Sequence, residues 1–348
     1  MIHHLVQIQY QKGEILSISR RQILALSGLF SMQIFGCGGD AVHASFNKSS
    51  SGAIIPLSGV VTTIGITGTT LNDPKGVAVN TSGELYISDS QNDRILDVSS
   101  GGILDLVTLS QALALNDPRG VAIGPDGSSY VADTGSNRIL KIDTSGAVSI
   151  LPSPLPLHNI PCGLAVDRND NVYIADSGRN RIIKISSAGL VTTVAGSGTP
   201  SLTNGNGMAA DFKFPTGVAV DAQGDLYIAD AENHVVRKID ANGDVTTIAG
   251  SGSAGFSDGN GTTAQFNYPW GIVSDSIGNI YITDRDNNRI RKLAANGDVT
   301  TVAGSGISGL ADGPGATAQF NMPTAISIDG NGCLYVADMG NNAIRKIT

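Results

Sequence analysis

The first residues of this 348-residue chain that could do chemistry are aspartates that recur at regular intervals. A carboxylate can act as a general acid or base, and several together can bind a metal ion. Each of these aspartates, however, closes a similar short segment, such as Leu226–Asp230, and most precede an arginine five residues later. Because the same residue recurs in every segment, we expect each carboxylate to bond the following loop or that arginine rather than to act in catalysis. The aspartates are Asp89, Asp133, Asp176, Asp230, Asp284 and Asp338, and the arginines are Arg94, Arg138, Arg181 and Arg289.

The other chemically capable side chains form no catalytic pattern. Of the five histidines, only His234 lies in a loop inside the regular region, and a lone surface histidine is the simplest interpretation of it. We find no Ser-His-Asp order, no Cys-His pair, no phosphate-binding loop and no metal-ligand spacing. The sequence therefore predicts no catalytic residue, no metal site and no cofactor.

The regular intervals come from six copies of one segment. The copies begin at prolines spaced 44, 43, 54, 54 and 54 residues apart, which is typical of a repeat array. Alternating apolar residues predict two strands in each copy, and short turns rich in Gly and Asn lead to a third and a fourth. The second strand of each copy carries a tyrosine at the same place, and we expect these tyrosines to pack between neighbouring sheets. The prolines are Pro74, Pro118, Pro161, Pro215, Pro269 and Pro323.

The two ends of the repeated region complement each other. The last copy stops at Thr348 after its third strand, whereas residues 59–64 (GVVTTI) resemble the fourth-strand segments 243–248 and 297–302. Pairing between these ends would close a ring and remove two exposed sheet edges. The sequence thus predicts an all-β, six-bladed β-propeller with four-stranded blades, closed by an N-terminal strand that completes the C-terminal blade.

The repeated pattern resembles the NHL repeat. Each copy reads approximately P-x-G-V-A-V-D, L-Y-I-A-D, N-R-I-x-K-I and G-x-V-T-T-V-A-G, and the copies cover residues 56–348. Ala325 replaces the glycine in the last copy, and Val235 and Ala343 replace the usual arginine, which concerns local pairing only. The resemblance implies a six-bladed propeller. Similar propellers have two functions that the resemblance raises for this chain: RNA binding through a basic face, and metal-dependent catalysis in the central channel.

The residues before the repeats resemble an export signal. Ser19-Arg20-Arg21-Gln22-Ile23-Leu24 is similar to a twin-arginine motif, and the apolar run that follows is too short to span a bilayer. The run ends at Ile34-Phe35-Gly36-Cys37, which resembles a lipoprotein cleavage site. We therefore expect a signal peptide over residues 1–36, a lipid on Cys37, a flexible tether over residues 37–55, and the propeller over residues 56–348. This predicts an exported protein of the cell envelope, attached to the membrane only through its lipid.

The charge of the chain argues against nucleic acid as a partner. The net charge is −8, and removal of residues 1–36 changes it to −10. Such a surface repels phosphate at long range. Cys162 and Cys333 begin strands on opposite sides of the predicted ring, so we expect both to be unpaired.

The copies differ most in the connections between them. The connections into Pro215, Pro269 and Pro323 are about ten residues longer than the others, and their phenylalanines are expected to anchor them while the rest walls half of one face. The residues that follow the prolines should rim the channel on that face, together with the loops between the second and third strands. A tryptophan beside a tyrosine and several cations is a plausible ligand platform. The predicted ligand-binding residues are Lys75, Arg119, Arg179, His234, Tyr268, Trp270 and Arg285.

Two functions remain open from the sequence. The first is a non-enzymatic binding or scaffold module, a monomer that presents its loop-rich face to a protein, peptide or glycan. The alternative is a propeller enzyme that resembles peptidyl-hydroxyglycine lyases or lactone hydrolases, with a metal in the central channel. A stoichiometric metal in the purified protein would favour the alternative.

Overall fold

The computed structural model describes residues 6–9, 15–18, 31–35, 43–47, 59–99, 102–105, 113–152 and 160–348. The chain divides into two units, Met1–Ile55 and Pro56–Thr348. In the first unit β1 (Val6–Gln9) pairs with β2 (Ile15–Ile18), and β3 (Ser31–Phe35) pairs with β4 (His43–Asn47). The predicted twin-arginine motif and Cys37 lie outside the described residues. No helix among the described residues is long and apolar enough to cross a membrane.

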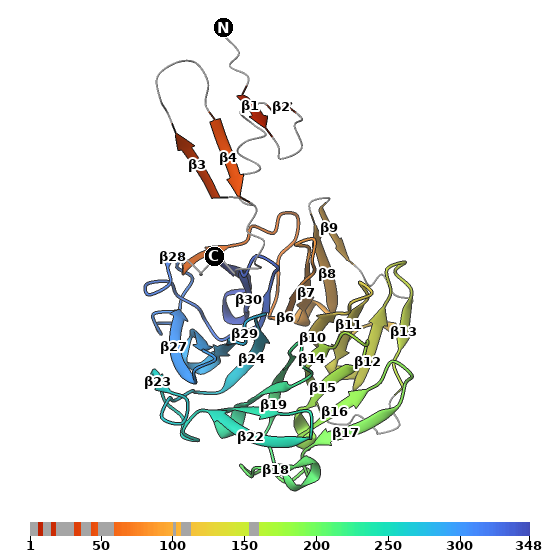
Figure 1. Ribbon diagram of the computed structural model, residues 1–348. Helices are drawn as coiled ribbons and strands as arrows, with labels where there is room; N and C mark the ends of the chain where they lie inside the picture. Colours follow the sequence, from red (N-terminus) through yellow and green to blue (C-terminus); the bar gives the residue numbers. More distant parts are fainter. Residues whose placement is uncertain are drawn as a thin grey trace. The chain divides into compact units, whose positions relative to one another are not determined.

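The second unit is a ring of six antiparallel sheets, one for each repeat, as the sequence predicts (Figure 1). In blades one to five the four strands of each repeat lie in chain order from the centre outward. Blade one contains β6 (Pro74–Val79), β7 (Leu85–Asp89), β8 (Arg94–Ser99) and β9 (Gly102–Asp105), and blade two contains β10 (Pro118–Ile123), β11 (Ser129–Asp133), β12 (Arg138–Ile142) and β13 (Val148–Ile150). Blade three contains β14 (Pro161–Val166), β15 (Val172–Asp176), β16 (Arg181–Ile185) and β17 (Val191–Ala195), and blade four contains β19 (Pro215–Val220), β20 (Leu226–Asp230), β21 (Val235–Ile239) and β22 (Asp244–Ala249). Blade five contains β24 (Pro269–Ser274), β25 (Ile280–Asp284), β26 (Arg289–Leu293) and β27 (Asp298–Ala303), and blade six begins with β29 (Pro323–Ile328), β30 (Leu334–Asp338) and β31 (Ala343–Ile347).

The fourth strand of blade six comes from the other end of the unit, which confirms the predicted closure. β5 (Val60–Thr63) pairs antiparallel with β31, with Val61 opposite Ile347 and Thr63 opposite Arg345. The Gly59 amide donates to the Thr348 carbonyl at 2.8 Å. Val61 is fully buried in the core between blades five and six. The ring therefore has no free edge where its two ends meet.

The first strands of neighbouring blades approach each other so closely that glycine is the third residue of the strand in five of the six blades. A Cβ on Gly120 would lie 2.1 Å from the Cys162 carbonyl oxygen of the next blade, and one on Gly217 would lie 2.4 Å from the Trp270 carbonyl oxygen. This explains the repeated Pro-x-Gly pattern. In blade six Ala325 replaces the glycine, and β29 still pairs with β30 from Ile326 onward.

The apolar core lies between the blades. One cluster joins Tyr173 of blade three to Ile228 of blade four and to Phe212 of the connecting loop. Five of the six repeated tyrosines are buried, and Tyr86 is partly buried. These positions confirm that the tyrosines serve packing between sheets, as predicted.

The repeated aspartates are structural, and their predicted arginine partners are confirmed in blades one to three but wrong in blade five; for blades four and six no arginine partner was predicted. In blades one to three the partner stands five residues later, as in the Asp89–Arg94 ion pair at 2.7 Å. In blades four to six it stands seven residues later, so Asp284 pairs with Arg291 at 2.6 Å and not with Arg289. The equivalent pairs are Asp230–Arg237 and Asp338–Arg345, and all three of these arginines are fully buried.

These buried arginines hold the long connections. The guanidinium of Arg291 stacks on Phe266 at 5.0 Å and donates to the backbone carbonyls of Gln265 and Ser257. Phe212, Phe266 and Phe320 are fully buried, which confirms that they anchor the loops.

The second half of each long connection covers the outer edge of the blade that follows it. The two-residue strands β18 (Gly205–Asn206), β23 (Gly259–Asn260) and β28 (Gly313–Pro314) pair with β22, β27 and β5 as fifth strands (Figure 1). The expectation that these loops wall half of one face is therefore wrong for this part of each loop. Pairing satisfies backbone groups that would otherwise stay open at the sheet edge.

Candidate functional site

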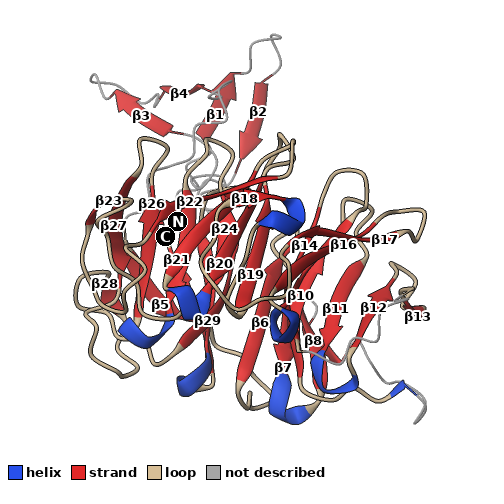
Figure 2. Ribbon diagram, turned by 90° about the horizontal axis from the view of Figure 1, so that it is seen from below, coloured by secondary structure: helices blue, strands red, loops and turns tan. Residues whose placement is uncertain are grey.

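The turns between the second and third strands gather on one face of the ring, which we call the loop face (Figure 2). Each is a single 3-10 turn followed by a residue in the left-handed conformation, with φ between 50° and 57°. Arg179 and Arg285 lie in two of these turns, and His234 directly follows a third. The turns are η1 (Ser90–Asn92), η3 (Thr134–Ser136), η4 (Ser177–Arg179), η6 (Ala231–Asn233), η7 (Arg285–Asn287) and η8 (Met339–Asn341).

The residue after the turn fastens its blade to the next one. In blade four this residue is His234, whose Nδ1 accepts the backbone N–H of Tyr268 at 3.1 Å. Asparagines do the same in other blades, where Asn180 Oδ1 accepts from Phe214 N and Asn288 Oδ1 accepts from Met322 N. His234 was predicted as a ligand-binding residue, and the structure shows that its Nδ1 makes a structural hydrogen bond. Sequence reasoning missed this because a histidine stands where asparagine is usual in the repeat.

We expect this histidine to make stability depend on pH. Burial lowers the pKa of His234 below its ordinary value of about 6.5, because it disfavours the charged ring. The neutral ring is also the form whose Nδ1 can accept the Tyr268 amide. Its contribution is thus present above pH 6.5 and is lost as the pH falls toward the lowered pKa of the folded state. Between pH 7.5 and 5.5 the wild type should lose more free energy of unfolding than His234→Asn, by less than about 1 kcal/mol since the ring is partly exposed. Urea titrations at both pH values measure the difference, and equal pH slopes would contradict the assignment.

The residue before each proline adopts an unusual backbone conformation. All six have positive φ, between 46° and 59°, although none is glycine. Such conformations cost about 1–3 kcal/mol each and a following proline disfavours them further, so the surrounding structure must impose them. The pre-proline and post-proline residues together form a ring on the loop face, which we call the rim. The pre-proline residues are Asp73, Asp117, Ile160, Phe214, Tyr268 and Met322.

On blades one and two the rim is charged and internally neutralised. Lys75 Nζ lies 2.7 Å from Asp117 Oδ1 and 3.1 Å from Asp73 Oδ2. Arg119 bonds Asp117 Oδ2 at 2.8 Å, and its Nη1 lies 3.8 Å from the sulfur of Cys162. Burial raises the pKa of the Cys162 thiol, which favours its neutral form. The predicted cations Lys75 and Arg119 are therefore already paired by carboxylates of the rim, which the sequence did not reveal.

On blades four and five the rim is aromatic. The Tyr268 and Trp270 rings stack with centroids 5.9 Å apart, and Phe214 lies 6.4 Å from Tyr268 and 6.5 Å from Trp270. The guanidinium of Arg285 lies over both Tyr268 and Trp270, at 5.2 and 4.9 Å from the ring centroids. Tyr268, Trp270 and Arg285 were predicted, and the structure brings them together as one group. Phe214 was missed, because its role depends on a positive φ that brings it beside a ring 56 residues away.

A family model described as "NHL repeat" matches residues 71–96, 115–142, 159–185, 212–239 and 266–293. The chain is an NHL-repeat protein. This NHL propeller is 32% identical over 165 residues to the Arabidopsis thaliana protein Suppressor of quenching 1, chloroplastic, a match that covers 44% of this chain and 16% of that protein. It is 37% identical over 109 residues to NHL repeat-containing protein 2 of Gallus gallus, covering 30% of this chain and 15% of that protein. The chain thus spans less than a third of the length of these curated relatives.

Solved structures share the fold of this NHL propeller. An auxiliary nutrient binding protein from Bacteroides ovatus superposes with a TM-score of 0.67 at 21% identity, covering 99% of this chain and 88% of that one. Virginiamycin B lyase from Staphylococcus aureus superposes with a TM-score of 0.56 at 18% identity, covering 83% and 85%. At such identities the likeness concerns the fold alone.

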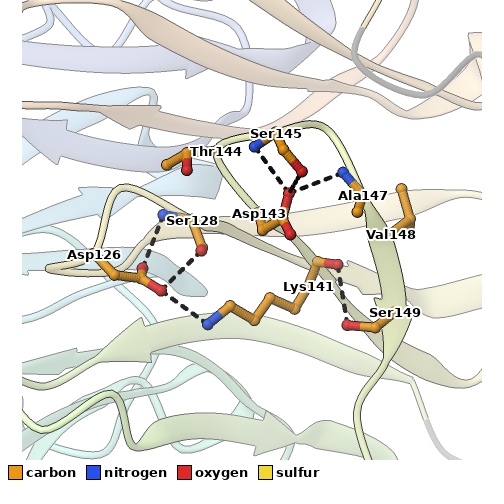
Figure 3. A pocket seen from close by; sticks show the side chains of 9 residues that line it. All are labelled: Asp126, Ser128, Lys141, Asp143, Thr144, Ser145, Ala147, Val148 and Ser149. Atoms are coloured by element: carbon orange, nitrogen blue, oxygen red, sulfur yellow. Dashed lines mark hydrogen bonds and ion pairs between the residues drawn. The ribbon is translucent and has the colours of Figure 1, made fainter.

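The NHL propeller also has a hollow of about 430 Å³ on blade two, at the end of the strands opposite the loop face. Figure 3 shows that its polar groups bond one another. Asp126 accepts from Lys141 and Ser128, and Asp143 accepts from the amides of Ser145 and Ala147. These bonds belong to two hairpin turns, so the residues that line the hollow have a structural role. None of the predicted site residues lines it.

The described part of the NHL propeller contains no group of three or more His, Cys, Asp or Glu side chains that could hold a metal ion. The first strands facing the centre carry sequences such as Pro-Thr-Gly-Val-Ala-Val, which offer a metal few oxygen or nitrogen ligands. The described residues therefore do not fit the channel metal of the enzyme alternative, and we derive no reaction step through one.

Proposed function

We propose that this NHL propeller is an exported, non-enzymatic binding or scaffold module that takes a protein, peptide or glycan at its loop face. The observation that carries this proposal is the aromatic group of Phe214, Tyr268 and Trp270 with Arg285 above it. Large rings that are only partly buried, next to an arginine, are the side chains that most often dominate recognition surfaces. Two of the three rings belong to pre-proline residues with positive φ, so strained backbone supports their placement.

The position of the group agrees with a binding role. Loops on a rigid scaffold are where recognition concentrates, and the amides of five of the six pre-proline residues of the rim donate a hydrogen bond to the preceding blade. A similar fold occurs in proteins described as auxiliary nutrient binding proteins, which supports binding of a ligand by analogy of fold only. A net charge of −8 disfavours nucleic acid as the ligand.

Export rests on the sequence before the repeats. We propose that the signal peptide is cleaved before Cys37 and that a lipid on Cys37 tethers a monomeric propeller to the membrane. Mass spectrometry of the mature N-terminus tests this, and an intact leader or an unmodified Cys37 would contradict it.

The binding role predicts that Trp270→Ala abolishes capture of the partner while the ring stays folded. The full chain is immobilised, and glycans, peptides and envelope proteins that it retains are identified. The variant should lose them, since the stacked platform is gone, while its melting temperature stays within a few degrees. The fold survives because the Trp270 contact that holds the blades together is its backbone carbonyl, which accepts the Thr216 hydroxyl at 2.9 Å.

The matched control is Ile277→Ala in the same blade. Ile277 is an apolar side chain, 64% exposed, in the turn at the opposite end of β24. This variant should retain the partner. Loss of the partner from the Ile277 variant with retention by the Trp270 variant would place the binding surface on the other face.

A further inference from the structure

Around the loop face, a hydroxyl side chain of each blade donates a hydrogen bond to a backbone carbonyl of the next blade; we call this bond the latch. In blades one to three the first residue of the 3-10 turn does this. Ser90, Thr134 and Ser177 donate to the carbonyls of Pro118, Pro161 and Pro215 at 2.5 to 2.6 Å. In blades four and six the latch moves to the residue after the proline, where Thr216 donates to the Trp270 carbonyl and Thr324 to the Pro74 carbonyl. In each of these five blades one of the two positions is therefore structural.

Blade five has a hydroxyl at neither of these two positions. Its first turn residue is Arg285 and its post-proline residue is Trp270. A different residue, Thr283 on β25, closes the interface by accepting the Gly271 amide at 2.7 Å and donating to the Thr324 carbonyl at 2.5 Å. Because the Thr283 hydroxyl makes the hydrogen bond from blade five to blade six, the side chains of Arg285 and Trp270 are not needed for that contact. In blade five, the first turn residue and the post-proline residue therefore carry a guanidinium and an indole in place of a hydroxyl.

The donors of Arg285 are almost unused by the protein. Its Nη2 lies 3.9 Å from the sulfur of Met322, a weak acceptor, and its Nε makes no hydrogen bond. Nε forms a partly exposed ion pair with Asp286 Oδ1 at 3.6 Å, a distance too long for a hydrogen bond. The side chain of Arg285 is 23% exposed, and its guanidinium stacks on Trp270 and Tyr268, which restricts the plane of the group. In contrast, Arg119 bonds Asp117 through both Nε and Nη2.

We propose that Arg285 is a preorganised receptor for a carboxylate, and that the ligand of the loop face carries this carboxylate next to a ring or another flat apolar group. This deepens the proposed function and rests on it. A guanidinium fork binds a planar carboxylate with two parallel bonds, and a stacked fork loses little conformational entropy when it does so. The neighbouring faces of Trp270, Tyr268 and Phe214 accept the apolar part of the same ligand. A sugar acid and an amino-acid carboxylate both have this chemistry, and the test separates them.

Trp270 is the one tryptophan of the chain, so its fluorescence reports on this site alone. The full chain is titrated with trigalacturonic acid and with its neutral methyl ester, and separately with N-acetylphenylalanine and with its amide. We expect a saturable change in emission with one of the two acids and at least tenfold weaker binding of its uncharged counterpart. Arg285→Gln should weaken binding of that acid at least tenfold, and Arg285→Lys, which keeps the charge without the fork, should weaken it severalfold. Arg119→Gln, the control, should bind within twofold of the wild type.

Three results would overturn the proposal. They are equal binding of an acid and its uncharged counterpart, no change in emission with either acid up to 50 mM at about physiological salt, or loss of binding in Arg119→Gln but not in Arg285→Gln. Thermal melts show whether each variant is folded. If Arg285→Gln does not fold, Arg285→Lys still shows whether binding of the acid needs the guanidinium fork. If one of these results is found but partner capture is still lost in Trp270→Ala, the proposed binding function stands. Only the proposal that Arg285 binds a carboxylate is then rejected.

Discussion

Deletion of residues 59–64 should prevent the chain from forming a stable, soluble ring. The deletion removes β5, and with it the backbone pairing to β31 and β28 and the buried side chain of Val61. It leaves the third strand of blade six as an open edge, which favours aggregation. We expect a loss of more than about 4 kcal/mol, since several strand bonds and a core side chain disappear together. Size-exclusion chromatography and thermal denaturation measure the outcome.

The control for this deletion is Val60→Thr in the same strand. Val60 is 39% exposed, on the opposite side of β5 from Val61, and threonine keeps the branched Cβ that strands favour. This change should cost within about 0.5 kcal/mol. A deletion variant that melts within one or two degrees of the wild type would mean that β5 does not close the ring.

Replacement of Arg291 by alanine should cause the second large loss of stability, about 3–5 kcal/mol. Arg291 is fully buried and pairs with Asp284, which is also fully buried, at 2.6 Å. Removal of one partner leaves the other charge buried without compensation. The loop into blade five also loses its bonds from the guanidinium to the Ser257 and Gln265 carbonyls. Urea denaturation measures the stability, and limited proteolysis should show faster cleavage within residues 250–268.

The control for Arg291 is Lys213→Ala. Lys213 forms an exposed ion pair with Glu232 at 3.5 Å, and such pairs contribute at most about 1 kcal/mol. If Arg291→Ala cost no more than Lys213→Ala, the buried arginines would not be the anchors of the long connections.

The topology of the ring could be predicted from sequence because it depends on local patterns. The prolines mark the start of each first strand, and the period-two alternation and the turn glycines mark the strands and turns that follow. The closure was also predictable, since residues 59–64 carry the fourth-strand pattern that the last repeat lacks. The glycine two residues after five of the six prolines has a cause that only the structure shows: a Cβ on Gly120 would lie 2.1 Å from a carbonyl oxygen of the next blade.

The chemistry of the rim was predictable only in part, because it depends on contacts between blades. The sequence indicated Trp270, Tyr268 and Arg285 but could not place Phe214 beside them, since no local pattern predicts a positive φ before proline. Lys75 and Arg119 looked like free cations because the sequence does not show that Asp117 bonds both. Arg289 was chosen as the partner of Asp284 from its spacing in other repeats, whereas the true partner, Arg291, stands two residues further along the same strand.

Hydroxyl-radical footprinting of the full chain with its captured partner tests the central claim, that the rim of blades four and five is the binding surface. Tryptophan, tyrosine and methionine react readily with the radical, and Trp270, Tyr268 and Met322 stand together at this rim around Arg285. The account predicts that the partner lowers the oxidation of these three side chains several-fold and leaves that of Ile277, at the opposite end of blade five, unchanged. Unchanged oxidation of Trp270 together with protection of Ile277 would contradict it.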